Sequence, residues 1–356
     1  MANWQTGWPQ AGPRSGWVGS QLHIDELTFP IAPAGLEILR SRAGKLLRMP
    51  GAAGEPDSQF TPESAVSAFL APVIQTIKHG PGIVLLRGLD PSRDSLEELG
   101  KMFWLIGRHI GSPLSQNAAG ERLTRVEATD GARQGVLRAY LSDGSLSFHT
   151  DPTEILALLC VRQAQSGGVN RFVSSLQVRE VIAREFPEHL PALERGFRYS
   201  RLDEQPPGAA PITPYQVPVF ATARGLMSCC WVGRVGAQLA AQQGGAELSA
   251  AQAAALEVFE QVAGRIEHQF HALLEPGDIV FVNNYEVMHA RESFQDSGDP
   301  ARKRLLLRLW LECDPSRPLS PQMYIHQNAS GRNGVDPVPG GSGGRAWIRR
   351  TAPRAG

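Results

Sequence analysis

The sequence predicts a mainly β fold with flanking helices, of the α+β class, built as a sandwich or barrel of strands. Two observations lead to this prediction. From about residue 136 onward, short apolar runs alternate with turn residues, which is typical of β proteins. Helical patterns gather N-terminal to these runs and in one stretch near 250–263.

The first clear helix is predicted within residues 61–80. Thr61 is placed as its N-cap with Pro62 at the first helical position, and Pro72 is expected to kink it. Its apolar residues fall on one face: Val66, Phe69, Leu70, Val73, Ile74 and Ile77. The segment is therefore predicted to be an amphipathic helix.

Two capping boxes begin further helices. Ser95 with Glu98 begins one, and Ser249 with Gln252 begins the helix near 250–263. The strand-like segments are "GIVLLRGL" (82–89), "VLRAYL" (136–141), "ILALLCV" (155–161), "NRFVSS" (170–175), "DIVFVNN" (278–284) and "RLLLRLWLE" (304–312).

Composition excludes several classes of partner. Among 356 residues, 35 Lys plus Arg balance 35 Asp plus Glu, so no basic excess favours nucleic acid or an anionic membrane. No run approaches the roughly 20 apolar residues of a transmembrane helix, and the N-terminus lacks the order of a signal peptide. We expect a cytoplasmic protein that acts on a small molecule. The four cysteines are expected to be reduced.

The chain divides into three parts. Residues 1–20 read as a flexible N-terminal segment, 21–325 as one domain, and 326–356, rich in Gly and Pro, as a flexible tail. The tryptophans Trp4, Trp8 and Trp17 have two alternative interpretations: they cover a neighbouring chain, as in a homo-oligomer, or they are disordered.

A histidine and an aspartate begin an otherwise apolar strand in "SLSFHTDPTEILALLC" (145–160). His149 and Asp151 are two residues apart, so in a strand their side chains point to the same side. A carboxylate facing a protein interior is unfavourable unless a positive charge meets it. A divalent metal would satisfy both side chains.

A third ligand must come from elsewhere, and His289 in "EPGDIVFVNNYEVMHARESF" (275–294) is the candidate. A His-x-Asp pair with a remote His makes the facial triad of non-haem Fe(II), which leaves three coordination positions open. Open positions are what chemistry with O2 requires.

An arginine-bearing strand follows in "RKRLLLRLWLE". Arg304, Leu306, Arg308 and Trp310 share one face by the period-two rule. Because a buried guanidinium calls for an anion, a dicarboxylate cosubstrate would fit: one end on the metal, the other on Arg304.

These segments, in this order, resemble the TauD/TfdA (taurine dioxygenase-like) family of Fe(II)- and 2-oxoglutarate-dependent oxygenases. The resemblance covers most of the folded body, and "LSFHTDPTEILALLCVRQAQSGGVNRFVSS" (146–175) and "LEPGDIVFVNNYEVMHARESFQD" (274–296) are its most specific parts. It implies a double-stranded β-helix, the jelly-roll of the clavaminate synthase-like proteins.

The resemblance also implies roles for single residues. Fe(II) would be held by His149, Asp151 and His289, and the far carboxylate of 2-oxoglutarate by Arg304. Asn170 stands where the family commonly has Ser or Thr as a second cosubstrate contact, and Arg308 where some members contact cosubstrate or substrate. The implied reaction oxidises a C–H bond with O2 and releases succinate and CO2. An intact Asp151 favours hydroxylation, desaturation or ring formation over halogenation.

On position alone, Ser145, Ser147 and Phe148 are expected to face the substrate. Each candidate also has a structural alternative: Arg304 could pair with Glu154 and Arg308 could be structural. Arg291 could pair with Asp296, His268 and His271 are expected to be solvated, and Gly167 and Gly168 make a hairpin turn. Two other functions use the same residues: a zinc hydrolase on the three ligands, and a non-catalytic binding protein on an oxygenase scaffold.

Overall fold

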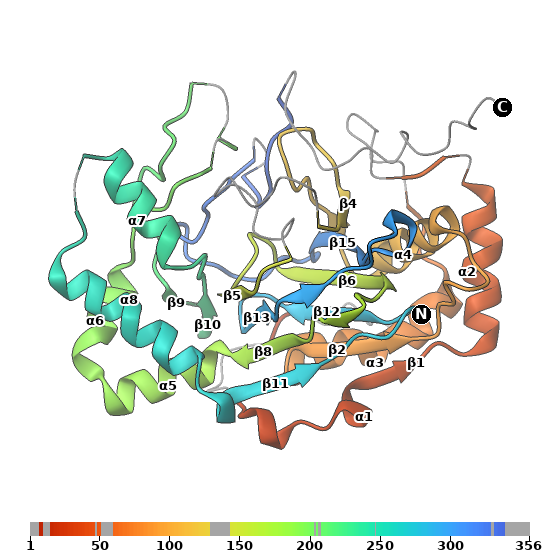
Figure 1. The fold of residues 1–356 in the computed structure, drawn as a ribbon, viewed down its shortest axis with the longest axis horizontal. Helices are drawn as coiled ribbons and strands as arrows, with labels where there is room; N and C mark the ends of the chain where they lie inside the picture. The colour runs from red at the N-terminus through yellow and green to blue at the C-terminus, as the bar shows by residue number, and fades with distance from the viewer. Residues whose placement is uncertain are drawn as a thin grey trace.

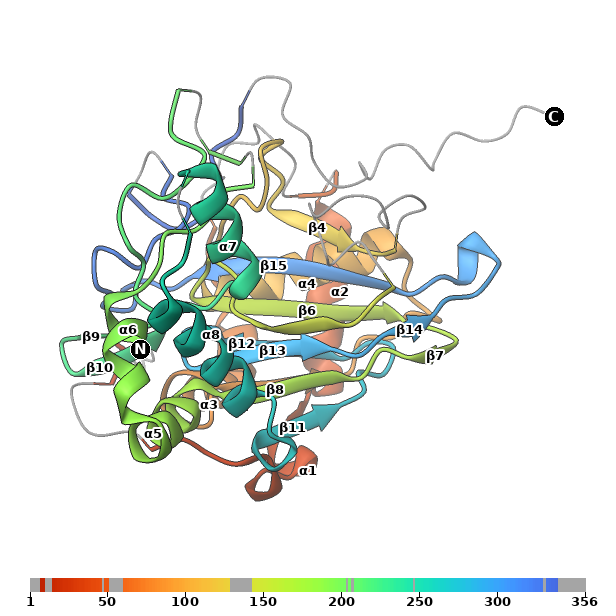
Figure 2. The ribbon, with the colours of Figure 1, turned by 60° about the vertical axis from the view of Figure 1, so that its left-hand side comes forward.

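The computed structural model of the chain describes residues 7–9, 15–46, 48–50, 60–128, 143–202, 204–205, 208–245, 247–328 and 331–338. Within these residues, two sheets pack face to face and helices cover their outer sides (Figures 1 and 2). The layer between the sheets is apolar, and both sheets contribute to it through residues such as Leu85, Val280 and Leu306 from one and Phe172 and Val287 from the other.

The larger sheet has seven strands, in the order β1-β2-β12-β6-β15-β3, with β4 also paired to β15. The strands are β1 (Thr28–Pro30), β2 (Ile83–Arg87), β3 (Ser112–Pro113), β4 (Leu123–Val126), β6 (Ile155–Arg162), β12 (Ile279–Asn283) and β15 (Leu305–Glu312). Strand β2 pairs antiparallel with β12, β12 with β6, and β6 with β15. Among the described strands, only the edge pair of β1 and β2 is parallel.

The smaller sheet has four strands, in the order β11-β8-β13-β5. They are β5 (Leu146–His149), β8 (Asn170–Ser174), β11 (Gln269–Ala272) and β13 (Val287–Arg291). Two short antiparallel pairs lie outside the main sheets: β7 (Ser166–Gly167) with β14 (Phe294–Gln295), and β9 (Phe220–Ala223) with β10 (Leu226–Cys229).

Helices gather on opposite sides of the strands, as Figure 1 shows. One group packs on the larger sheet: α2 (Pro33–Lys45), α3 (Ser64–His79) and α4 (Leu96–Ile110). The other packs on the smaller sheet: α5 (Ser175–Glu185), α6 (Leu190–Arg195), α7 (Arg234–Gln243) and α8 (Ala250–Ala263). Shorter elements are α1 (Ile24–Leu27), η1 (Gly19–Gln21), η4 (Pro187–His189), η5 (Ile266–His268) and η6 (Pro300–Arg302).

The alternation along β15 explains why this strand can serve both a core and a pocket. Leu305, Leu307, Leu309 and Leu311 join the cluster under the helices, and Leu306 and Trp310 join the cluster between the sheets. Successive side chains of a strand point to opposite faces, so one strand supplies both layers.

The predicted fold class is confirmed: helices flank two sheets arranged as a jelly-roll. Five of the predicted strands are β2, β6, β8, β12 and β15, and the predicted strand 136–141 lies outside the described residues. Both predicted capping boxes are present, at α4 and α8. Gly167 and Gly168, at φ +74° and +78°, have the backbone conformation that a hairpin turn uses and that favours glycine.

The predicted start of the first helix is wrong. Helix α3 begins at Ser64, and Glu63, in an extended conformation, is its N-cap in place of Thr61. The backbone N–H of Glu63 donates to Nε2 of His109 on α4 at 3.0 Å, so a contact with another helix holds Glu63 outside the helix. The helix then continues through Pro72 as one element and buries Leu70, Val73, Ile74 and Ile77.

The described parts of both termini contact the folded body. The indole of Trp8 is buried, and Nε1 of Trp17 donates to the carbonyl of Pro81 at 2.9 Å. Within the segment expected to be a flexible tail, Val335 donates from its backbone N–H to the carbonyl of Ser115 at 3.0 Å. Trp4 and residues 339–356 lie outside the described residues.

In the described part of the chain, none of the helices combines the length and the apolar character that crossing a membrane requires. The cysteines Cys160, Cys229, Cys230 and Cys313 are all buried and free, as expected.

The capping box of α4 gives a test of the fold. The Ser95 side chain accepts from the N–H of Glu98 at 3.3 Å, and the Glu98 carboxylate accepts from the N–H of Ser95 at 2.8 Å. Ser95→Ala should lower the free energy of unfolding by about 1 kcal/mol, measured by urea denaturation. Ser41→Ala, at an exposed position inside α2, is the control and should not destabilise. Equal stability of the two variants would contradict a capping role for Ser95.

Candidate metal centre and its pocket

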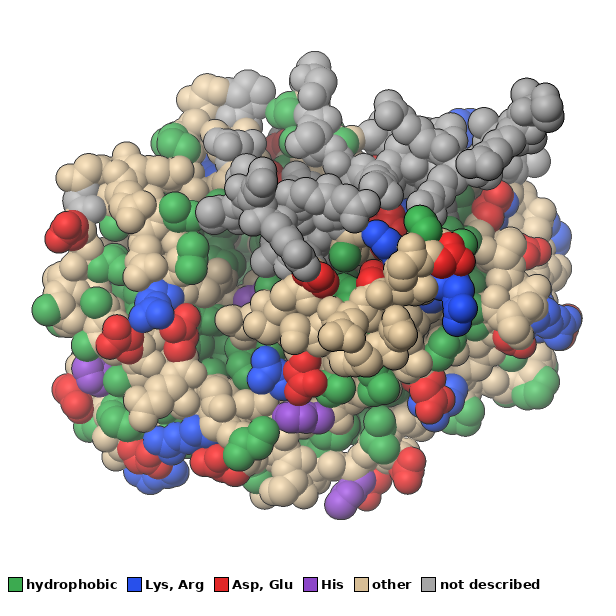
Figure 3. Space-filling model, in the orientation of Figure 1, with side chains coloured by type: hydrophobic (Ala, Val, Ile, Leu, Met, Phe, Trp, Pro, Cys, Tyr) green, Lys and Arg blue, Asp and Glu red, His purple; other side chains and the backbone are tan. Residues whose placement is uncertain are grey.

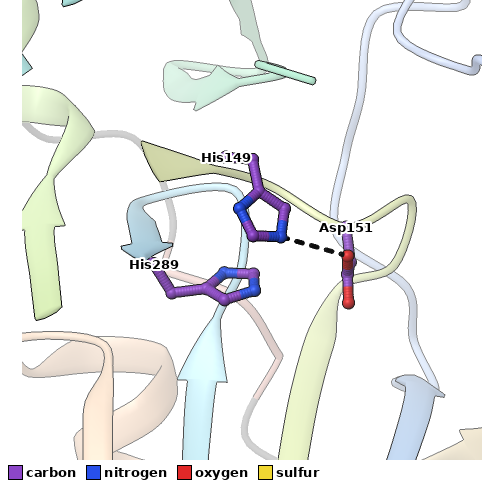
Figure 4. A group of neighbouring side chains, drawn as sticks. All are labelled: His149, Asp151 and His289. Atoms are coloured by element: carbon purple, nitrogen blue, oxygen red, sulfur yellow. Dashed lines mark ion pairs between the residues drawn. The ribbon is translucent and has the colours of Figure 1, made fainter. Parts of the chain in front are cut away.

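Three side chains converge at the end of the smaller sheet, as Figure 4 shows. His289 on β13 lies directly opposite His149 on β5 in the antiparallel register, and Asp151 follows β5 by two residues. One ligand atom from each of His149, Asp151 and His289 lies within 4.8 Å of the others. The imidazole centres are 4.1 Å apart, and Nε2 of His149 is 3.8 Å from Oδ1 of Asp151. The sequence-predicted triad therefore meets at one point.

The two histidines present ring nitrogens that suit a metal. Nδ1 of His149 lies 2.9 Å from the carbonyl of Ser147, which fixes the ring and leaves Nε2 as the lone-pair donor that faces Asp151. Burial lowers the pKa of His289 to about 3, so its imidazole is neutral, as a metal ligand must be. Nδ1 of His289 is buried without a hydrogen-bond partner among the described residues.

Asp151 is a buried carboxylate surrounded by donors. Burial acts to raise its pKa, yet the pKa lies below its ordinary value because the Arg308 charge, together with the hydrogen bond from Trp310, favours the ionised form. Its Oδ2 accepts from the indole Nε1 of Trp310 at 2.8 Å and from Nη1 of Arg308 at 3.4 Å. Asp151 is thus held as an anion beside the two histidines.

This donor set fits Fe(II). Two imidazole nitrogens and one carboxylate oxygen within mutual reach are the facial arrangement that leaves three positions for exogenous ligands. The residues that would hold the metal are His149, Asp151 and His289. When bound, Fe(II) would supply the binding and activation of O2 that protein side chains cannot provide.

A cavity of about 540 Å³ contains this triad, a size typical of small-molecule sites. Figure 3 shows the hollow between the helices on the left of that view and the strands on the right, with hydrophobic side chains in its wall. Polar lining comes from the triad, Asn170, Arg291, Arg304 and Arg308, and apolar lining from residues such as Val126, Leu156, Leu158, Leu202, Val235 and Leu239. The site is therefore a concave pocket with a few convergent polar groups.

Arg304 lies directly before β15 and lines the pocket. It is 5 % exposed, and burial lowers its pKa. Its guanidinium lies over the ring of Phe294, 5.1 Å from the ring centre, and makes no ion pair or hydrogen bond to any described residue. A Cβ at Gly168 would come within 3.4 Å of its Nε, so the glycine leaves room for this side chain.

Arg304 does not pair with Glu154, the structural alternative that the sequence offered. The carboxylate of Glu154 accepts instead from the backbone N–H groups of Cys313 at 2.9 Å and Arg317 at 2.6 Å. Glu154 therefore anchors the segment that follows β15, and Arg304 is left facing the pocket as a buried cation.

Arg308 and Arg291 also line the pocket, with partners of their own. Arg308 pairs with Asp151, and its Nε donates to Oε1 of Gln116 at 2.7 Å. Arg291 donates from Nη2 to the carbonyl of Gly144 at 2.5 Å, and burial lowers its pKa to about 10. Asp296, the predicted partner of Arg291, accepts instead from the backbone N–H of Arg304 at 2.6 Å.

The remaining predicted residues also line the pocket. Asn170 begins β8 and is buried, with Nδ2 3.5 Å from the carbonyl of Ala272. Ser145 and Ser147 are exposed lining residues, and Phe148 packs in the cluster outside the smaller sheet with the Arg171 guanidinium 5.5 Å from its ring centre. The register of β5 against β13 shifts between the pair His149–His289 and the pair Leu146–Arg291. Such a bulge is common beside active sites.

Sequence reasoning gave no role to three residues that position the triad. Gln116 contacts Arg308, Trp310 contacts Asp151, and Asn284 accepts from the N–H of Asp151 at 3.1 Å. The period-two pattern put Trp310 on the correct face, but no spacing rule connects Gln116 or Asn284 to residues far away in the chain.

The prediction for the two other histidines is right for one of them. His271 is exposed on β11, but His268 is buried, because η5 packs against η1. His268 and His271 are not part of the described metal-ligand cluster.

A match to a known protein family identifies the class of protein that carries this pocket. A model of the taurine catabolism dioxygenase TauD, TfdA family matches residues 47–310, which include the triad, Arg304 and Arg308. The chain belongs to this family. As a TauD/TfdA family member with the triad in place, it is an Fe(II)- and 2-oxoglutarate-dependent oxygenase that uses O2.

Two curated proteins are similar in sequence to the chain. FR-33289 synthase of Streptomyces rubellomurinus is 28% identical over 275 residues, covering 76% of this chain and 80% of that protein. Taurine hydroxylase-like protein SAT17 of Stachybotrys chartarum is 26% identical over 310 residues, covering 82% of this chain and 77% of that protein.

Solved structures share the fold of this family member. An asparagine oxygenase in complex with Fe(II), 2S,3S-3-hydroxyasparagine and succinate superposes with a TM-score of 0.59 at 18% identity, covering 80% of this chain and 93% of that one. The non-heme iron oxygenase OrfP in complex with Fe and alpha-ketoglutaric acid gives a TM-score of 0.58 at 15% identity with the same coverage.

The triad makes a direct prediction about metal binding. His149→Ala and Asp151→Ala should each abolish stoichiometric Fe(II) binding, measured as iron content after anaerobic loading and desalting, because two ligands cannot hold the ion. His271→Ala, which removes an exposed histidine of the same sheet, should bind iron as the unchanged protein does. Full iron loading of the first two variants would refute the assignment.

Proposed function

We propose that this oxygenase hydroxylates a C–H bond of a small polar substrate, with one oxygen atom of O2 entering the product and the other entering succinate as 2-oxoglutarate loses CO2. The single observation that carries the proposal is Arg304, a buried cation without an ionic partner among the described residues, in the cavity that contains the triad. A dicarboxylate that reaches from the metal to Arg304 would supply the missing anion.

The chain's own residues have separate tasks in this proposal. His149, Asp151 and His289 hold Fe(II), Arg304 binds the far carboxylate of 2-oxoglutarate, and Asn170 stands beside it at the start of β8. The apolar walls of the cavity exclude water around the reacting groups, which strengthens each charge interaction within. The proposal is supported by the asparagine oxygenase, which was solved with Fe(II) and succinate, and by OrfP, which was solved with Fe and alpha-ketoglutaric acid.

Ser145, Ser147, Phe148 and Arg308 complete the proposed site on the substrate side. Arg308 would face an acidic group of the substrate or cosubstrate while Asp151 and Gln116 hold two of its nitrogens. The substrate is small and polar because the pocket combines arginines, an amide and hydroxyls with a limited volume.

The reaction is tested by succinate release. The Fe(II)-loaded enzyme with ascorbate, 2-oxoglutarate and O2 should form succinate above its background rate when a panel of amino acids, sulfonates and betaines includes a substrate. Turnover that needs zinc and proceeds without O2 would instead favour the alternative function, a zinc hydrolase that uses the same three ligands. A panel that yields no turnover, from an enzyme that binds neither iron nor 2-oxoglutarate, would favour the binding protein.

Arg304 makes the cosubstrate proposal quantitative. Breaking a buried charge-paired contact costs about 2–5 kcal/mol, so Arg304→Ala should weaken 2-oxoglutarate binding by roughly thirtyfold or more. The measurement is calorimetric titration of the Co(II)-loaded, anaerobic protein. Arg302→Ala, two residues earlier and exposed on η6, is the control and should leave the affinity unchanged. An unchanged affinity in Arg304→Ala would remove this residue from the cosubstrate site.

A further inference from the structure

The two oxygens of the Asp151 carboxylate have different surroundings. Oδ2 accepts from the indole Nε1–H of Trp310 at 2.8 Å and from Nη1 of Arg308 at 3.4 Å. Oδ1 is the oxygen that faces Nε2 of His149, at 3.8 Å. One oxygen is therefore occupied by protein donors, and the other faces His149.

The donors on Oδ2 are themselves held in place. Gln116 accepts from Nε of Arg308 at 2.7 Å and from Oγ1 of Thr124 at 2.9 Å, and its amide nitrogen donates to the carbonyl of Arg122 at 2.8 Å and that of Arg308 at 3.0 Å. The amide nitrogen of Gln116 thus donates both of its hydrogen atoms to backbone carbonyls. The guanidinium of Arg308 cannot turn away from Asp151 without breaking its hydrogen bond to Gln116.

Trp310 is fixed by packing as well as by hydrogen bonding. Its side chain is 5 % exposed and belongs to the apolar cluster between the sheets. The Arg308 guanidinium lies over its ring, 4.9 Å from the ring centre. An indole can only donate, so its N–H specifies an acceptor, and a carboxylate oxygen is the strongest acceptor within reach.

The main chain of Asp151 is clamped in the same way. Asn284, in the turn between β12 and β13, accepts from the N–H of Asp151 at 3.1 Å and donates from Nδ2 to the carbonyls of Asp151 and Thr153. Because backbone and Oδ2 are both fixed, the carboxylate has little freedom to rotate about its side-chain bonds.

We propose that Trp310 is a positioning residue that, together with Arg308 braced by Gln116, occupies Oδ2 of Asp151 so that the carboxylate ligates the metal through Oδ1 alone. This inference rests on the proposed function only in that a metal binds the triad. A carboxylate that bound through both oxygens would take a fourth coordination position and leave two for other ligands. Chelating 2-oxoglutarate and O2 together need three positions, so the indole N–H protects the position that the reaction requires.

The test is Trp310→Phe, which keeps a large aromatic ring and removes the N–H. In the Co(II)-loaded protein, the visible absorption of the metal should change before any cosubstrate is added, because the freed Oδ2 can turn toward the ion. Affinity for 2-oxoglutarate should fall tenfold or more, in line with the effect of other groups that orient metal ligands.

Matched variants separate this role from general packing. Trp104→Phe alters another buried tryptophan, on α4 away from the triad, and should leave both the Co(II) spectrum and the 2-oxoglutarate affinity unchanged. Gln116→Leu, which frees Nε of Arg308, should shift the spectrum in the same direction as Trp310→Phe. Gln163→Leu is its control, since the Gln163 amide donates to the backbone carbonyl of Leu274.

The outcomes distinguish this inference from the proposed function. A Trp310→Phe protein with the wild-type Co(II) spectrum and an affinity for 2-oxoglutarate within twofold of wild type would overturn the positioning role. Should this variant fail to fold, benzothienylalanine placed at position 310 removes only the N–H from an isosteric ring and is judged by the same two measurements. Failure of the unchanged Co(II) protein to bind 2-oxoglutarate would defeat the proposed function, while the spectral comparison would still decide the role of Trp310.

Discussion

The antiparallel pairing of β13 with β5 is the constraint on which the site depends. It sets His289 opposite His149, so both imidazoles leave the sheet at neighbouring points on the same side. A slip of one residue would turn His289 outward, toward the cluster that holds Met288 and Ala290. Pairing of β13 with β8 on its other side fixes this register, so the stability of the sheet and the geometry of the triad are one property.

Charge in an apolar interior is the second constraint, and it follows from the first. The layer between the sheets is built from aliphatic and aromatic side chains, yet it borders the ionised groups of Asp151, Arg304 and Arg308. Arg308 and Asp151 offset each other at 3.4 Å, whereas the Arg304 guanidinium lies over the face of Phe294 and forms no ion pair with a described residue. One cavity therefore holds a group of side chains that favours a bound cation, the triad, and another that favours a bound anion, Arg304. This arrangement is the basis of the proposed cosubstrate site.

Features that repeat along a strand, or that involve residues close together in the chain, could be predicted from the sequence. Alternation in 304–312 separated core leucines from pocket residues, and the spacing of His149 and Asp151 placed them on one side. Apart from the meeting of His289 with His149 and Asp151, several features that depend on contacts between distant segments were missed or predicted wrongly. The start of α3 is set by His109 on another helix, His268 is buried by η1, and Gln116 reaches Arg308 from a loop. None of these contacts produces a periodic pattern in the amino-acid sequence.

Local physics explains this division. Period-two alternation, capping boxes and turn glycines act over a few residues, so the amino-acid sequence by itself determined five of the strands, the α+β class, the candidate metal-ligand residues and the family resemblance. Which oxygen of Asp151 accepts from Trp310, which pocket arginine has no ion pair with a described residue and where α3 begins depend on side chains that meet only after the elements pack together. The tertiary structure decided these because a buried polar group takes its partner from whatever lies within about 3 Å in space, whatever the distance in sequence.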